Sequence, residues 1–276
     1  KIPVSFSQFQ DLRTSCTEPA DQTTGIDAQN SGLSVLSSHF EDLRIGIRAN
    51  MLDENNGSFI ASGNDFSGCY RGVQTLSSSS FSIVTNNFTV RRPKECPALN
   101  VEIIGVKLEG NTCGFTFMGN QFSSDVNGLI DGILIGTDCS DLKDGMNNTI
   151  FDNTYNELWV GNRATGYNGY DNDGLLYICN QNNNILNADF DIPFGSVRKI
   201  QAGNNALGNL APTGNSFTDL FFTKRFNNLG GFTVDYYYLA NDPLQDPTQE
   251  GGSEGINPFD ISFQNNNCGI SEPCLP

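Results

Sequence analysis

Carboxylates are the residues in this sequence with the clearest capacity for chemistry, so their spacing is the first question. Hydrolysis of a glycosidic bond needs two carboxyl groups on either side of that bond. The sequence has no adjacent Asp-Asp pair, and its one histidine, His39, lies between Ser38 and Phe40. The basic pair Arg198-Lys199 would suit an acidic sugar, but no Gly-His-Gly segment accompanies it. The sequence favours a non-enzymatic protein, with a carbohydrate-active hydrolase or lyase as the alternative.

The charge balance excludes several classes of partner. The chain has 276 residues, with 15 Lys+Arg against 31 Asp+Glu, and a net charge of −16. Such a surface repels the phosphates of nucleic acids and the headgroups of anionic membranes. It also repels polyanionic polysaccharides. No apolar stretch is long enough to span a bilayer. We therefore expect no nucleic-acid binding and no membrane insertion, while a neutral glycan stays open as a ligand.

Two groups of acidic residues offer the oxygen ligands that calcium prefers. Their members are Asp138, Asp141 and Asp144 in the first group, and Asp171 and Asp173 in the second. The second group resembles the start of a calcium-binding loop, but Asn182 stands where that loop would carry a bidentate glutamate. Solvated turns have the same composition. Calcium is the one candidate cofactor, and ordinary turns are the alternative.

Aromatic residues crowd one region between Asn and Asp residues: Tyr155, Trp159, Tyr167, Tyr170 and Tyr177. Rings of this kind stack on the apolar faces of sugars, while amides and carboxylates bind the hydroxyl groups. The sequence thus predicts a glycan-binding surface at Trp159, Tyr167 and Tyr170. The alternative is that Trp159 and Tyr177 point into the core while Tyr167 and Tyr170 lie in a loop.

The cysteines are even in number and irregular in spacing: Cys16, Cys69, Cys96, Cys113, Cys139, Cys179, Cys268 and Cys274. No Cys-x-x-Cys motif is present, which argues against zinc and thioredoxin-like chemistry. We expect a disulfide framework formed in an oxidising compartment. Its connectivity cannot be deduced from spacing, although Cys268 and Cys274 are close enough for one tight loop. Buried free thiols are the alternative.

A repeated unit indicates which elements would position these residues. A polar or Asn residue is followed two positions later by an aromatic and then by a Gly before an apolar residue. The aromatics are Phe40, Phe66, Phe88, Phe122 and Tyr155, and the glycines assigned to them are Gly46, Gly72, Gly105, Gly132 and Gly161. Short strands with period-two alternation surround each unit. Repetition at roughly 30 residues is typical of a solenoid whose stacked turns bury a shared core.

The fold class predicted is therefore all-β, a right-handed parallel β-helix over residues 20–240. We expect residues 1–20 to form an N-terminal cap or leading segment, and residues 241–276 an irregular loop with one further strand at Asp260. Asn residues at one corner should stack as an amide ladder and tolerate left-handed backbone there. A β-sandwich is the alternative.

One part of the chain resembles a known group of proteins. The segments concerned are Gly174-Leu-Leu-Tyr-Ile-Cys-Asn180, Asp189-Phe-Asp-Ile192, Ala211-Pro-Thr-Gly-Asn-Ser-Phe217 and Asp235-Tyr-Tyr-Tyr238. Their order is similar to that in large secreted and cell-surface proteins of Bacteroidetes, which are exported by the type IX pathway through a separate sorting domain. The resemblance implies a β-helix, an extracellular location and disulfides. It carries over no catalytic residue.

These observations lead to one functional hypothesis with two alternatives. We expect an extracellular structural or adhesion module of a bacterial surface or secreted protein, serving as a rigid stalk or filament component. Its partners would be other surface proteins, further domains of the same longer chain, or glycans. A carbohydrate-active enzyme and a non-catalytic glycan-binding module on the same fold are the alternatives.

Overall fold

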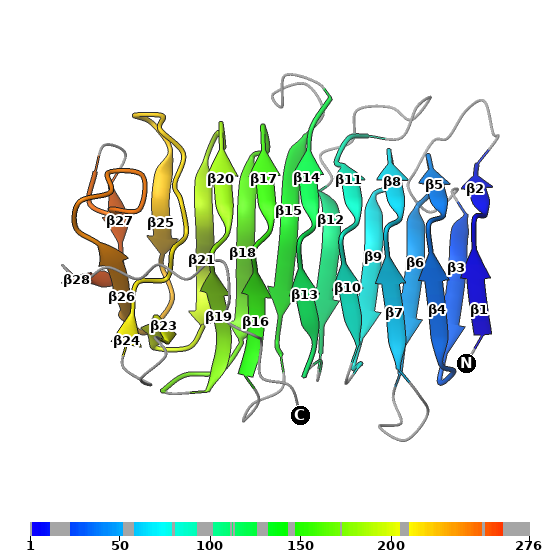
Figure 1. Cartoon of the computed structure of the whole chain (residues 1–276), viewed down its shortest axis with the longest axis horizontal. Coiled ribbons are helices and arrows are strands. Elements are labelled where there is room, and N and C mark those ends of the chain that lie inside the picture. Colours follow the sequence, from blue (N-terminus) through cyan, green and yellow to red (C-terminus); the bar gives the residue numbers. More distant parts are fainter. Residues whose placement is uncertain are drawn as a thin grey trace.

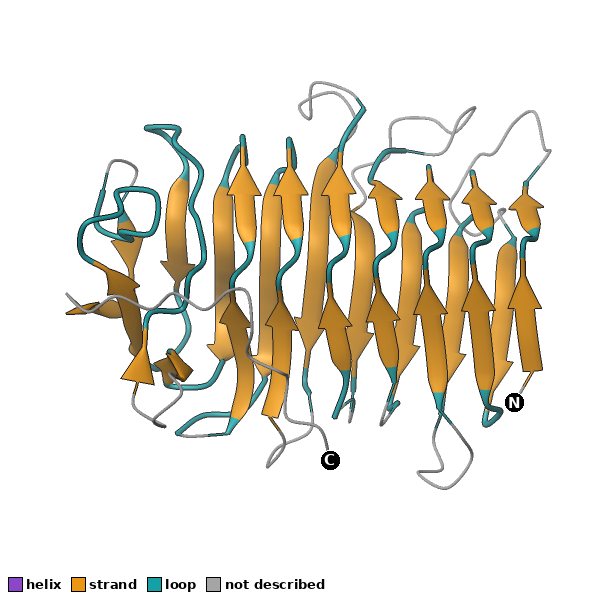
Figure 2. Cartoon of the chain, viewed as in Figure 1, coloured by secondary structure: helices purple, strands orange, loops and turns teal. Residues whose placement is uncertain are grey.

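The computed structural model describes residues 2–11, 23–51, 58–78, 81–92, 102–110, 112, 114–125, 132–142, 147–171, 173–204, 210–249 and 252–261. Every regular element in these ranges is a β-strand (Figure 2). No helix long and apolar enough to cross a membrane occurs among these residues.

Three long parallel sheets form the body of the molecule. The first contains β1 (Ile2–Ser5), β4 (Leu33–Leu36), β7 (Phe59–Ser62), β10 (Ser82–Val84), β13 (Thr116–Met118), β16 (Asn147–Phe151) and β19 (Gly174–Ile178). The second contains β2 (Gln8–Gln10), β5 (His39–Glu41), β8 (Asp65–Ser67), β11 (Asn87–Thr89), β14 (Gln121–Ser123), β17 (Thr154–Asn156) and β20 (Gln181–Asn183). Each strand pairs with the equivalent strand of the next coil.

The third sheet contains β3 (Thr24–Gln29), β6 (Ile45–Asn50), β9 (Arg71–Leu76), β12 (Glu102–Glu109), β15 (Ile133–Ser140), β18 (Val160–Tyr167), β21 (Ala188–Ser196), β25 (Lys224–Asn228) and β27 (Ser253–Glu254). In Figure 1 the first two sheets run upward at the front, the third runs downward behind them, and successive coils advance to the left. That path is right-handed. The predicted right-handed parallel β-helix is confirmed.

Near both ends of the chain, the described strands pair with other strands of the structure. Strands β1 and β2, within the stretch predicted as a cap, pair in register with β4 and β5. At the other end, β22 (Ile200–Gln201), β26 (Val234–Leu239) and β28 (Ile256–Ile261) form a short parallel sheet, and β23 (Gly203–Asn204) pairs antiparallel with β24 (Leu210–Ala211). The strand predicted near Asp260 begins earlier, at Ile256.

A column of stacked rings occupies the core behind the second sheet. Its members are Phe9, Phe40, Phe66, Phe88, Phe122 and Tyr155, with ring centroids 4.6 to 4.9 Å apart and ring planes within 10° of parallel. This spacing equals the distance between paired strands, so each ring keeps the register of its coil. The repeated aromatic seen in the sequence is therefore the register-setting residue of each coil.

A row of glycines in the third sheet makes room for these rings. A Cβ on Gly72 would lie 2.7 Å from Phe88, and one on Gly136 would lie 2.4 Å from Tyr155. The repeat pattern predicted Gly132 as the glycine of the Phe122 unit, and that prediction is wrong, because Gly136 pairs with Gly105 in this row. The number of residues between the ring and the next strand of the third sheet differs from coil to coil. The sequence distance from ring to glycine is therefore a poor guide to the pairing.

A second column, made of polar side chains, follows the corner between the first two sheets. It contains Ser38, Asn64, Asn86, Asn120, Asn153, Asn180 and Asn215, all buried. Each Asn Oδ1 accepts hydrogen bonds from the residue of the preceding coil, as in Asn86 Nδ2 to Asn120 Oδ1 at 3.0 Å. The predicted amide ladder is present. The left-handed backbone falls one residue earlier, as at Thr85 with φ 54°.

Candidate functional site

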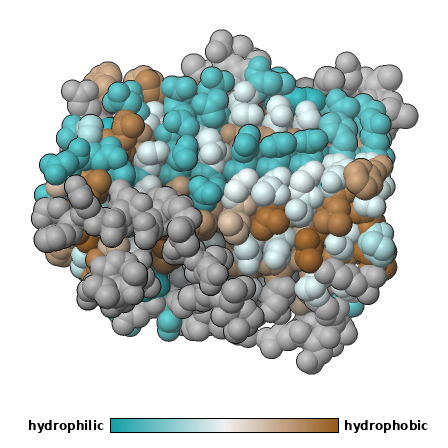
Figure 3. Space-filling model, in the orientation of Figure 1, coloured by the Kyte–Doolittle hydropathy of each residue, from teal (hydrophilic) through white to brown (hydrophobic). Residues whose placement is uncertain are grey.

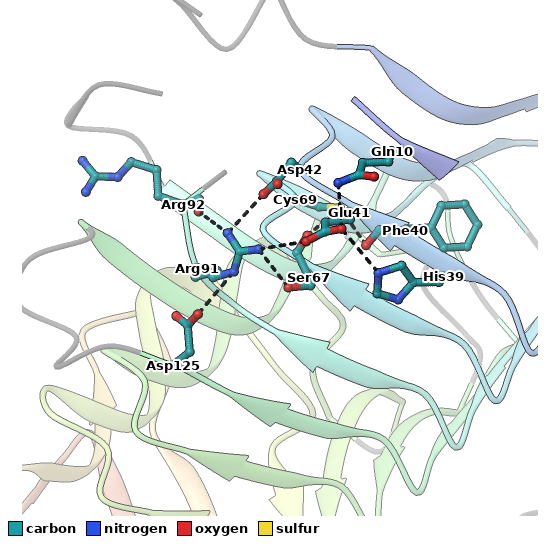
Figure 4. Close-up of polar contacts among 10 residues, drawn as sticks. All are labelled: Gln10, His39, Phe40, Glu41, Asp42, Ser67, Cys69, Arg91, Arg92 and Asp125. Atoms are coloured by element: carbon teal, nitrogen blue, oxygen red, sulfur yellow. Dashed lines mark hydrogen bonds and ion pairs between the residues drawn. The ribbon is translucent and has the colours of Figure 1, made fainter. Parts of the chain in front are cut away.

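The densest cluster of charged side chains in the described residues surrounds Arg91, at the corner that follows the second sheet (Figure 4). Arg91 lies two residues after β11, Asp42 directly follows β5, and Asp125 lies two residues after β14. Arg91 Nη1 donates to Asp42 Oδ1 at 3.1 Å, and its Nε lies 3.3 Å from Asp125 Oδ2. Glu41 Oε1 is 3.8 Å from Arg91 Nη2. One guanidinium thus connects four successive coils.

Burial makes this cluster more than a surface ion pair. The Arg91 side chain is 8 % exposed and that of Asp42 is 9 % exposed, whereas Asp125 is 48 % exposed. Ser67 Oγ accepts a further hydrogen bond from Arg91 Nη2 at 3.1 Å. Gly68 leaves the space for the pair, since a Cβ there would lie 2.4 Å from Asp42 Oδ1 and 2.5 Å from Arg91 Nη1.

The remaining side chains of the cluster do not form a nucleophile with a base. Burial raises the pKa of the Cys69 thiol to about 12, so the thiolate that a nucleophile requires is absent at neutral pH. His39 Nε2 lies 3.8 Å from Glu41 Oε2, which also accepts from Gln10 Nε2 at 2.9 Å. The Gln10 hydrogen bond ties two neighbouring coils together, while His39 and Glu41 lie on the same strand. The cluster is therefore best described as an electrostatic clasp, by which we mean ion pairs and hydrogen bonds around one arginine that link successive coils.

A second clasp lies on the outer face of the third sheet. Arg163 Nε and Nη2 donate to the two oxygens of Asp138 at 3.1 and 3.0 Å, and both of its Nη atoms also contact Glu102. The hydrogen bond from Arg163 lowers the pKa of Glu102. Asp138, a predicted calcium ligand, is therefore the buried partner of an arginine.

The other predicted calcium ligands lie in turns. Asp141 Oδ1 accepts a hydrogen bond from the Tyr167 backbone N–H at 2.9 Å. The Asp171 carbonyl accepts from Lys199 N, and the Asp173 N–H donates to the Tyr170 carbonyl. Asp144 lies outside the described residues. Within the part of the chain that the structure describes, no three His, Cys, Asp or Glu side chains are placed to hold a metal ion.

The structure separates the three predicted glycan-binding residues. Trp159 packs on a small apolar cluster of Ile104, Ile135 and Val160 at the start of β18. Tyr167 ends β18, about 25 Å away at the rise of a β-strand, and Tyr170 follows it. The Tyr170 ring packs against the Phe232 ring at a tilt of 35°, with ring centroids 4.3 Å apart. Tyr155 and Tyr177 are buried in the core.

Of the predicted disulfide cysteines, Cys69 and Cys139 are free and buried. They behave as the small hydrophobes of the alternative interpretation. Cys179 is disulfide-bonded, but no disulfide joins two of the described cysteines. Cys16, Cys96, Cys113, Cys268 and Cys274 lie outside the described residues.

Polar residues take the place of the ring and of the glycine in the coil after Tyr155. The repeat pattern did not predict them. Asn182 occupies the ring position after Tyr155, and Asp189 occupies the position after Gly161 in the third sheet. Both are buried. Asp189 Oδ2 accepts from Thr218 N at 2.9 Å, and burial raises the pKa of Asp189 to about 7. The signal was available, because Asn and Asp replace Tyr and Gly in an otherwise regular repeat.

The raised pKa of Asp189 has a measurable effect on stability. Between about pH 4 and pH 7 the folded state retains a proton that the unfolded state has released, so stability is lost as pH rises. Relative to the wild type, we expect Asp189→Asn to gain about 1.4 kcal/mol of unfolding free energy per pH unit across this window. Urea denaturation at pH 4.5, 5.5 and 6.5 measures the difference. A difference between the wild type and Asp189→Asn that stays constant across the three pH values would contradict the prediction.

No protein-family model, no curated protein and no solved structure matches this chain. The class of the molecule is therefore defined by its architecture alone, a parallel β-solenoid without helices in its described residues.

Proposed function

We propose that this chain is a non-catalytic structural and adhesion module, a rigid stalk segment of an extracellular bacterial protein. The observation that carries the proposal is the axial continuity of its core. The ring column and the amide ladder both run through successive coils, and the strands of the first two sheets pair in register from coil to coil. Columns of this kind resist bending and stretching along the axis, because each coil is held by the next.

The outer surface supports the same function. The two outward positions of each second-sheet strand are polar in all seven coils, beginning with Gln8 and Gln10 and ending with Gln181 and Asn183. Figure 3 shows this polar surface as a band along the upper front of the molecule. A regular polar face keeps an elongated body soluble and prevents lateral aggregation.

The charged clusters support a structural role over a catalytic one. Glu41, Asp42 and Asp125 all face the guanidinium of Arg91, and Asp138 and Glu102 face that of Arg163. Glycoside hydrolysis would require two carboxyl groups that face a sugar instead. The extracellular location and the bacterial group rest on the resemblance of residues 174–238 to secreted β-helix proteins.

Three measurements test this function. Small-angle scattering should give the profile of a rod whose shape persists as urea rises to just below the unfolding transition. Incubation with neutral and acidic polysaccharides should release no reducing ends and no unsaturated products. If the wild type releases such products and Asp125→Asn, which changes an exposed carboxylate, does not, the protein is an enzyme and the proposal is wrong. Surface labelling of intact cells of the source organism should detect the protein, and purely internal staining would refute the location.

A further inference from the structure

Five large apolar side chains gather at one corner beyond the third sheet. They are Tyr167, Tyr170, Phe194, Leu229 and Phe232, here called the corner patch. Tyr167 is 47 % exposed, Phe194 60 %, Leu229 59 % and Phe232 46 %. Tyr170 is partly buried against the Phe232 ring. Single exposed apolar residues are ordinary, but a contiguous group marks an interaction site.

Three glycines bring these side chains together at the carboxyl ends of β18, β21 and β25, which are neighbours in the third sheet (Figure 1). A Cβ on Gly195 would lie 1.8 Å from the Gly166 carbonyl oxygen, and one on Gly230 would lie 2.4 Å from the Gly195 carbonyl oxygen. The three backbones are thus in direct contact. Tyr167 and Phe194 flank this contact on adjacent strands, since Tyr167 pairs with Ser196 and Thr165 with Phe194.

Backbone hydrogen bonds fix the second half of the patch. Leu229 N donates to the Ile192 carbonyl at 2.9 Å, and Asn228 Nδ2 donates to the Phe232 carbonyl at 2.8 Å. The turn from Leu229 to Phe232 is therefore anchored on β21. A preorganised patch loses little conformational entropy when a ligand binds.

The size of the patch limits what can bind it. Four half-exposed side chains of this size offer on the order of 400 Å² of apolar surface. A stable protein interface buries about 800 Å² on each partner. The corner patch is half of that, so it fits a small or linear ligand better than a folded protein.

The surroundings of the patch decide the chemistry of that ligand. Asp141 lies beside Tyr167, because its Oδ1 accepts a hydrogen bond from the Tyr167 backbone N–H. Asp171 and Asp173 are exposed and close to Tyr170 in the sequence. The whole chain carries a net charge of −16. Carboxylates around aromatic rings accept hydrogen bonds from hydroxyl groups and repel anions. A pyranose has both matching features, an apolar C–H face and a rim of hydroxyl donors.

We propose that the corner patch binds a neutral oligosaccharide. Sugar rings would stack on the exposed faces of Tyr167, Phe194 and Phe232, and their hydroxyl groups would donate to Asp141 and Asp171. Trp159, which lies at the opposite end of β18, takes no part. This inference rests on the proposed adhesion function and names the class of partner.

Titration calorimetry with cellohexaose, mannohexaose and xylohexaose tests the proposal, with a polygalacturonate hexamer as the anionic comparison. At least one neutral hexamer should bind, and the anionic one should not. Phe194→Ala and Tyr167→Ala should each weaken binding by about tenfold, the loss expected for one ring contact. Phe222→Ala is the matched control, because Phe222 is exposed to a similar degree outside the patch. It should leave the affinity unchanged.

Three results would overturn the inference. They are no binding of any neutral hexamer at millimolar concentration, binding that survives both patch variants, and dimers in light scattering that Phe194→Ala dissociates. The patch side chains are exposed, so these variants should retain the wild-type melting temperature, and the assay reports binding rather than folding. If the hexamers fail while scattering still gives a stiff rod, the glycan site is lost but the stalk function stands.

Discussion

Asn120→Ala should lower the free energy of unfolding by about 5 kcal/mol, because its side chain takes part in four buried hydrogen bonds of the amide ladder. Asn120 Oδ1 accepts from both the backbone N–H and the Nδ2 of Asn86 at 3.0 Å. Its Nδ2 donates to the Ile83 carbonyl at 2.9 Å and to Asn153 Oδ1 at 3.0 Å. Truncation leaves several buried donors and acceptors without partners, and each costs about 1 to 3 kcal/mol.

Equilibrium denaturation in urea measures this loss, and a neighbouring asparagine supplies the control. Asn87 is exposed and makes one side-chain hydrogen bond, to Asp65 Oδ1 at 2.8 Å. Asn87→Ala should cost less than about 1 kcal/mol because water replaces that contact. Equal effects of the two substitutions would show that the ladder contributes no more than a surface amide. The stiffness inferred for the core would then lack its basis.

The ladder and the ring column were accessible from the sequence because each coil repeats the same residue at the same place. Asn64-Asp-Phe66, Asn86-Asn-Phe88 and Asn120-Gln-Phe122 keep one spacing within a strand and its corner. Within such a short unit there is no loop to change the register. Stacking of identical groups also favours identical residues, so the physical cause leaves a visible pattern.

The pairing register between strands that are separated by a loop could not be predicted from the sequence in the same way. Gly132 and Gly136 are four residues apart, and it is Gly132 that precedes an apolar residue, whereas Thr137 follows Gly136. Only the position of the Tyr155 ring, which a Cβ on Gly136 would meet, shows which of them belongs to the row. That contact joins two different coils. A spacing rule within one coil contains no information about it.

The charged clusters were missed for a related reason. Arg91 reaches Asp42 and Ser67, which are 49 and 24 residues away in the sequence. Such partners occur once, not once per coil, so no repeat points to them. Their positions follow from the coil-to-coil stacking, which the sequence defined only approximately. For the same reason Asp138 looked like a calcium ligand, although Arg163 lies beside it in the next coil.

The predicted aromatic surface grouped residues that lie near opposite ends of one strand. Trp159 and Tyr167 are eight residues apart, which in a loop would allow a shared surface. In β18 that separation spans the whole width of the third sheet. The rings that do join Tyr167 and Tyr170 come from β21 and the turn after β25, which lie close through stacking rather than through sequence.

Arg91→Met should cost about 3 to 5 kcal/mol in unfolding free energy, the loss typical of breaking a buried ion pair. Methionine keeps the length and apolar stem of the side chain, so the change removes mainly the charge and its donors. Asp42 would be left buried beside Glu41 without the guanidinium that both face. Because Arg91 joins four coils, the loss should appear in the global transition measured by urea denaturation rather than as local fraying.

Two further variants separate charge from packing at this site. Arg48→Met removes a guanidinium from an exposed pair, with Arg48 Nη1 3.4 Å from Asp27 Oδ2, and should cost less than about 1 kcal/mol. Adding Asp42→Asn to Arg91→Met removes the unpaired carboxylate and should recover part of the lost stability. If the double variant is no more stable than Arg91→Met, the uncompensated charge of Asp42 is not the cause. The lost hydrogen bonds from Arg91 to Ser67 and to the Arg92 carbonyl would then account for the effect, and the electrostatic clasp would be refuted.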